Sequence, residues 1–126
     1  MKRTSVYLAL VFIGVATTVA CDSGSKKVGQ AGDAPLVALP SSAARIENDE
    51  GLGHFQQGHW DVALEHYRKG VTADPNSAVV HYNIALTLDK MGKHDDATAS
   101  FKKALELAPN DPAIRDSEIL KKHLGM

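Results

Sequence analysis

The chain has 126 residues, enough for one small domain, and a formal net charge of −1. This balance gives no electrostatic case for nucleic-acid binding, which normally requires a clustered basic surface, so we expect no nucleic acid partner. A single cysteine excludes an internal disulfide.

Residues 1–20 have the layout of a secretory signal peptide. Lys2 and Arg3 precede an uncharged, mostly apolar run that is short for a membrane-spanning helix. The run ends in Ala20-Cys21, which resembles the lipobox of bacterial lipoproteins. That resemblance implies a Cys21 carrying palmitate-type acyl chains, a lipid bilayer as partner, and a lipid-anchored place on a bacterial cell membrane, facing the periplasm or the exterior. An uncleaved signal anchor and an unmodified thiol are the alternatives.

Residues 21–42 are predicted to be a tether between the lipid and a folded domain. Gly, Ser, Pro and Ala dominate the segment, and it shows neither helical nor strand periodicity. An apolar stretch, Leu36 to Leu39, lies between Pro35 and Pro40. One interpretation is a linker with a few apolar residues. The other is an extended strip that packs on the domain and covers apolar surface there.

Residues 44–77 are predicted to form a pair of helices. The first should run over about 42–57, with Ser41 or Ser42 as its N-cap, and the second over about 60–73, ending at Asp74-Pro75-Asn76. The helical repeats that this segment resembles carry a small residue at the position of Gly51, so that the paired helix can pack close. Gly53 has no such role and should weaken the first helix by roughly 1 kcal/mol relative to Ala.

A second pair, over 78–111, repeats the first at an offset of 34 residues. Its helices are expected over about 77–91 and 94–108, and Asp111 with Pro112 should start a capping helix over about 112–124. The offset aligns Gly58 with Gly92, Ala63 with Ala97, Tyr67 with Phe101 and Pro75 with Pro109.

A 34-residue period of this kind is typical of a helix-turn-helix repeat, and here it resembles the tetratricopeptide repeat (TPR) family. The resemblance implies an all-α fold for residues 43–126, a short TPR helical solenoid of two repeats plus a C-terminal capping helix. Two repeats fall short of the usual three or more, so we expect dimerisation or a partner to add stability.

No residue pattern predicts chemistry. The six histidines lie in no recognisable metal-binding spacing, and we find no nucleophile paired with a base. We therefore expect no enzyme activity, no catalytic residues, no cofactor and no metal. Metal or haem handling through the histidines is the minority hypothesis.

In TPR proteins the first helix of each repeat lines a concave groove. The resemblance assigns the groove positions here to Arg45, Asn48, Leu52, Phe55, Val79, Tyr82, Leu86 and Asp89. Asn83 resembles the asparagine with which carboxylate-clamp TPRs hold a partner's C-terminus. The basic residues of that clamp are missing, because Asn48, Leu52, Ala113 and Ser117 occupy their positions.

Four of these groove residues, Leu52, Phe55, Tyr82 and Leu86, are apolar or aromatic and suit a helix or an extended peptide as ligand. Alternatively, several of them pack inside the domain or under the tether. The expected function is that of a membrane-anchored TPR lipoprotein that docks a protein or peptide partner in the cell envelope, as an interaction scaffold or assembly factor. A structural lipoprotein that self-associates, for example as a homodimer, is the competing hypothesis.

Overall fold

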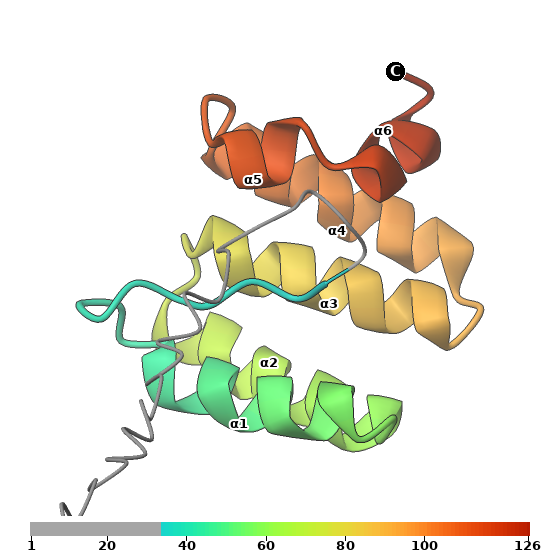
Figure 1. The fold of residues 1–126 in the computed structure, drawn as a ribbon. Helices are drawn as coiled ribbons and strands as arrows, with labels where there is room; N and C mark the ends of the chain where they lie inside the picture. Colours follow the sequence, from blue (N-terminus) through green and yellow to red (C-terminus); the bar gives the residue numbers. More distant parts are fainter. Residues whose placement is uncertain (1–33) are drawn as a thin grey trace, which may run out of the picture.

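A computed structural model describes residues 34–126, so the predicted signal peptide and Cys21 lie outside the described residues. Six helices follow one another along this part of the chain, with no strand among its residues (Figure 1). They are α1 (Arg45–Gln56), α2 (Trp60–Ala73), α3 (Ala78–Lys90), α4 (His94–Leu107), α5 (Pro112–Arg115) and α6 (Glu118–Leu124). The all-α prediction is confirmed. Among residues 34–126, no helix has the length and apolar character needed to cross a membrane.

The first four helices form two antiparallel pairs, α1–α2 and α3–α4, which stack through contacts between α2 and α3 (Figure 1). Each pair turns at a glycine with positive φ, 78° at Gly58 and 75° at Gly92. Residues with a Cβ atom rarely adopt this conformation, so glycine suits both turns. The 34-residue spacing of the two glycines is therefore a structural repeat, as the sequence predicts.

Aromatic and small residues at equivalent positions fill the core. Tyr67 in α2 and Phe101 in α4 are fully buried, and Tyr82 from α3 packs edge-on against Phe101 with ring centroids 5.5 Å apart. Buried alanines in α2 and α4 allow the neighbouring helices to approach closely: Ala63, Ala97 and Ala104.

Gly51 lies where α1 packs tightly against Tyr67 of α2. A Cβ atom at Gly51 would lie 2.5 Å from Cε1 of Tyr67, whereas a Cβ atom at Gly53 would meet nothing within 4 Å. The need for a small residue at Gly51 is confirmed, and Gly53 meets no neighbour that would require a glycine.

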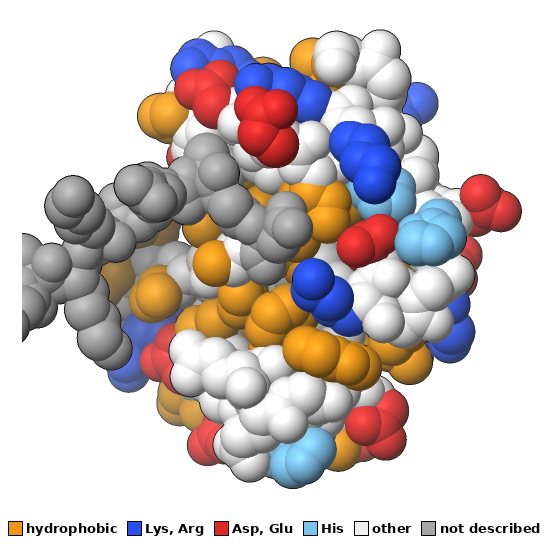
Figure 2. Space-filling model, turned by 45° about the vertical axis from the view of Figure 1, so that its right-hand side comes forward, with side chains coloured by type: hydrophobic (Ala, Val, Ile, Leu, Met, Phe, Trp, Pro, Cys, Tyr) orange, Lys and Arg blue, Asp and Glu red, His pale blue; other side chains and the backbone are white. Residues whose placement is uncertain are grey.

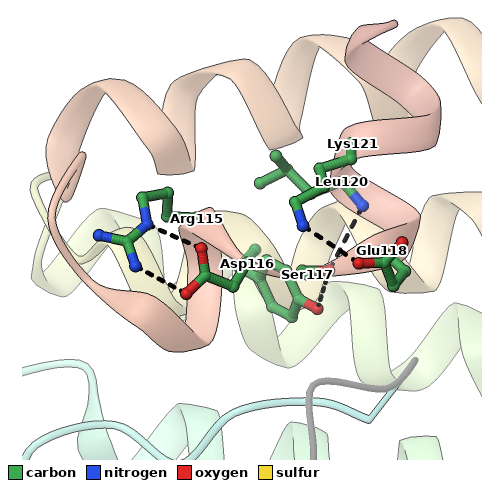
Figure 3. Close-up of polar contacts among 7 residues, drawn as sticks. Arg115, Asp116, Ser117, Glu118, Leu120 and Lys121 are labelled. Atoms are coloured by element: carbon green, nitrogen blue, oxygen red, sulfur yellow. Dashed lines mark hydrogen bonds and ion pairs between the residues drawn. The ribbon is translucent and has the colours of Figure 1, made fainter. Parts of the chain in front are cut away.

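The segment expected to form one capping helix over 112–124 is instead two short helices, α5 and α6. Asp111 starts α5, since its side chain accepts a hydrogen bond from the amide of Ala113 at 2.9 Å. The helix is then interrupted at Ser117, whose hydroxyl caps α6 by accepting from the amide of Leu120 at 3.3 Å (Figure 3). The same hydroxyl forms a hydrogen bond with Tyr82 Oη at 2.8 Å. A serine can satisfy both partners only with a non-helical backbone, so it ends the first helix and starts the second.

The start of the domain also differs from the sequence prediction. Helix α1 begins at Arg45 rather than near residue 42, and its N-cap position is Ala44, which makes no side-chain cap. Ser42 instead donates its hydroxyl hydrogen to Asp74 Oδ2 at 2.8 Å, at the turn between α2 and α3. Residues 34–39 run as an extended segment across α1 and α3 (Figure 1), and a turn at residues 40–41, closed by a hydrogen bond from the Ser42 amide to the Leu39 carbonyl at 2.9 Å, leads to α1.

Candidate functional site: the groove between α1 and α3

The residues before α1 lie across the groove that the first helix of each repeat was expected to form. We call residues 34–42 the strap. The strap is held through the main chain of Leu36, whose amide donates to Asn83 Oδ1 at 2.7 Å. The carbonyl of Leu36 accepts from Asn83 Nδ2 at 2.7 Å and from Asn48 Nδ2 at 3.1 Å. Of the two hypotheses for this segment, the extended strip on the domain is confirmed.

The two asparagines form one recognition unit. Asn48 and Asn83 lie on α1 and α3, are fully buried, and bond each other through Asn83 Nδ2 and Asn48 Oδ1 at 2.7 Å. A side-chain amide offers both a donor and an acceptor, so the carboxamide of Asn83 pairs with an extended backbone much as a neighbouring strand would. Because these contacts are made to the main chain of the bound segment, they place little restriction on the identity of its side chains.

Side chains of the strap alternate as in a β-strand. Leu36 packs against the core and Ala38 is 3% exposed, whereas Val37 and Leu39 are 72% and 69% exposed. Hydrophobic side chains gather in a band across this face of the molecule (Figure 2). The groove therefore contacts the main chain of an extended segment and the two side chains that point inward.

The other predicted groove residues do not all line the groove. Phe55, Tyr82 and Leu86 are buried, with exposed fractions of 7%, 1% and 0%, and belong to the core. Phe55 packs edge-on against Trp60 in α2 with ring centroids 4.8 Å apart. These inward-facing side chains on α1 and α3 thus pack against neighbouring helices. This agrees with the alternative interpretation, in which several of the predicted groove residues pack inside the domain.

Three predicted groove residues are more accessible. Leu52 and Val79 are half-buried, whereas Arg45 is exposed and lies 3.9 Å from Asp49 one helical turn away. An exposed ion pair of this kind contributes little to stability. Only Leu52 and Val79 therefore remain as apolar groove residues that are not fully buried, beside the asparagine pair.

Asp89, the last predicted groove residue, lies in a different place. At the end of α3 its Oδ1 atom is 3.0 Å from His94 Nδ1 and 3.0 Å from His123 Nε2. Partial burial raises the pKa of the Asp89 carboxyl, but the hydrogen bonds to His123 and His94 and their charges outweigh this, so its pKa lies below the usual value. The sequence does not reveal this grouping, because the three residues come from separate helices and fit no local motif.

A stack of antiparallel helix pairs with a groove that holds an extended main chain defines a helical-repeat binding scaffold. Residues 78–111 match the family model "Tetratricopeptide repeat", and residues 51–92 match the model "TPR repeat". Residues 51–111 are therefore tetratricopeptide repeats. Repeats of this family mediate protein–protein interactions.

Two similar proteins are eukaryotic and much longer than this chain. "RNA polymerase II-associated protein 3" of Xenopus tropicalis is 29% identical over 86 residues, which is 68% of this chain and 13% of that protein. "Stress-induced-phosphoprotein 1" of Caenorhabditis elegans is 29% identical over 90 residues, 71% of this chain and 25% of that protein. A solved structure titled "First TPR of Spaghetti (RPAP3) bound to HSP90 peptide SRMEEVD" is 21% identical with a TM-score of 0.42, covering 71% of this chain and 97% of that one.

Proposed function

We propose that this protein is a lipid-anchored interaction scaffold of the bacterial cell envelope, tethered through Cys21, whose TPR groove captures an extended segment of a partner protein. The observation that carries this proposal is the pair of buried asparagines that holds the main chain of Leu36. In this function a partner segment takes the place of the strap. The signal-peptide layout of residues 1–20 and the position of Cys21 support the envelope part of the proposal.

The groove can be tested without knowing the partner, because the strap itself supplies a ligand. The probe is a labelled peptide, APLVALPSS, with the sequence of residues 34–42. In the full chain, Ala38→Glu places a charge at a position that is 3% exposed, so the strap should leave the groove. We expect this variant to bind the peptide at least tenfold more tightly than the wild type, in which the attached strap competes at high effective concentration.

Two further variants control this measurement by fluorescence anisotropy. Val37→Glu changes a side chain that is 72% exposed, so the strap should stay bound and the peptide should bind as weakly as to the wild type. Adding Asn83→Ala to Ala38→Glu should abolish binding, because two of the three hydrogen bonds to the main chain at the Leu36 position are lost. Equal affinity of the Ala38→Glu and Val37→Glu variants for the peptide would refute a groove that exchanges extended segments.

The lipid anchor has its own test. With Cys21→Ser, we expect the protein to move from the membrane fraction to the soluble fraction and to lose incorporation of a labelled fatty acid, because acyl chains supply the membrane affinity. Mass spectrometry of the wild-type chain should show an acylated Cys21 at the mature N-terminus. A Cys21→Ser variant that stays in the membrane pellet would favour the uncleaved signal anchor instead.

A further inference from the structure

Three potential metal ligands converge where α3, α4 and α6 meet. Asp89 lies in the last turn of α3, His94 begins α4, and His123 comes from α6, and one ligand atom from each lies within 4.8 Å of the others. We call these residues the Asp-His-His cluster. They line a shallow pocket together with Lys122. On the face shown in Figure 2, histidine side chains lie next to an acidic one.

Hydrogen bonding around Thr98 fixes which nitrogen of His123 carries a proton. The Thr98 hydroxyl donates its single hydrogen to the carbonyl of His94 at 2.9 Å, so its oxygen must accept at its other contact, 2.8 Å from His123 Nδ1. His123 Nδ1 is therefore the donor. In the neutral ring Nε2 then carries a lone pair, and that lone pair points at the Asp89 carboxylate 3.0 Å away.

Two acceptors at this distance need a cation between them. A second proton on the ring is one solution, and a metal ion is the other. The contact from Thr98 to His123 is the kind of outer hydrogen bond that orients metal-binding histidines in proteins. The exposed His94, with a side chain 67% exposed at the first turn of α4, can adjust to complete the site.

Distances in the cluster suit a small divalent ion. Ligand bonds of about 2.0–2.1 Å at tetrahedral angles place nitrogen and oxygen about 3.3 Å apart, close to the two contacts of 3.0 Å. Imidazole and carboxylate ligands together suit zinc and its transition-metal neighbours rather than calcium or magnesium. Lys122 is an exposed cation that can turn away, and Asp95 and Asp96 beside His94 add negative charge.

We propose that Asp89, His94 and His123 bind a divalent transition-metal ion, with zinc as the best match. The site would fasten α6 to the junction of α3 and α4, and a fourth coordination position would stay open to water or to a donor from another molecule. Since the site joins the capping helix to the second repeat, metal binding should stabilise the C-terminal end of the domain.

The test is a zinc titration of the full chain in competition with a chromophoric chelator. We expect the wild type to bind one equivalent of zinc, and Asp89→Asn and His94→Gln each to lower the zinc affinity at least tenfold. Zinc should raise the thermal unfolding midpoint of the wild type but not that of these two variants. Thr98→Val keeps all three ligands but removes the acceptor for His123 Nδ1, so it should weaken binding less than loss of a ligand does. Both Asp89 and His94 lie near the surface, so their variants should still fold.

The matched control uses histidines elsewhere in the domain. His66 contacts Glu47 at 2.9 Å and stacks on His54, which makes the α1–α2 face the competing location for a metal. We expect His66→Ala to bind zinc as the wild type does. Zinc binding that is lost in His66→Ala but retained in Asp89→Asn and His94→Gln would overturn the proposal, and so would a wild type with no zinc binding at micromolar protein.

Discussion

Replacing Asn83 with alanine is expected to release the strap from the groove and to lower the free energy of unfolding by roughly 2–3 kcal/mol. The variant loses three hydrogen bonds, two to the main chain of Leu36 and one to Asn48. Each buried polar group left without a partner costs about 1–3 kcal/mol of stability. Detachment of the strap returns these groups to water, so the variant with a detached strap should have a lower free energy than one in which the strap stays bound.

Two measurements on the full chain check this expectation. Urea unfolding gives the change in stability, and hydrogen exchange reports on the Leu36 amide, which should be protected in the wild type and exchange rapidly in the variant. Asn76→Ala is the control, because Asn76 is exposed and bonds only through its backbone amide, so stability should change by less than about 0.5 kcal/mol. Continued protection of the Leu36 amide in Asn83→Ala would show that Asn83 does not hold the strap.

The second large effect is expected from one chemical change at two nearby glycines of α1. Gly51→Ala should lower the free energy of unfolding by roughly 2 kcal/mol, because the new methyl group would lie 2.5 Å from the buried ring of Tyr67 and the helices would have to separate. Gly53→Ala should raise it by about 1 kcal/mol, since its methyl group meets nothing and alanine favours the helix.

The two variants control each other. Both lie in the same helix and reduce the freedom of the unfolded chain equally, so the difference between them isolates the contact with Tyr67. Thermal and urea unfolding should give shifts of opposite sign. A stabilising shift in both variants would mean that α1 and α2 are not closely packed at Gly51.

Local and periodic features of the fold could be predicted from the sequence. The 34-residue offset, the turn glycines Gly58 and Gly92 and the breaks at Pro75 and Pro109 place the first four helices to within a few residues. The break at Ser117 was missed because its cause is not local. It depends on a buried hydroxyl contact with Tyr82, which lies 35 residues earlier in the chain.

Less of the candidate site could be predicted, for the same physical reason. Asn48 and Asn83 were assigned to the groove through the family resemblance, but their ligand was not, because the strap lacks any helical or strand periodicity of its own. The alternation of Leu36 and Ala38 inward with Val37 and Leu39 outward spans too few residues to be recognised. The Asp-His-His cluster exists only through packing of α6 against α4.

The strap also sets how far the domain can travel from its proposed anchor. Leu36 follows Cys21 by 15 residues, so with the strap bound the point where Leu36 contacts the domain lies at most about 50 Å from the lipid, at about 3.4 Å per residue. Release of the strap moves that point to Ser42, which Asp74 holds, and extends the limit to about 70 Å. A partner that displaces the strap would thereby lengthen the connection between lipid and domain, and the domain could reach a roughly threefold larger volume above the membrane.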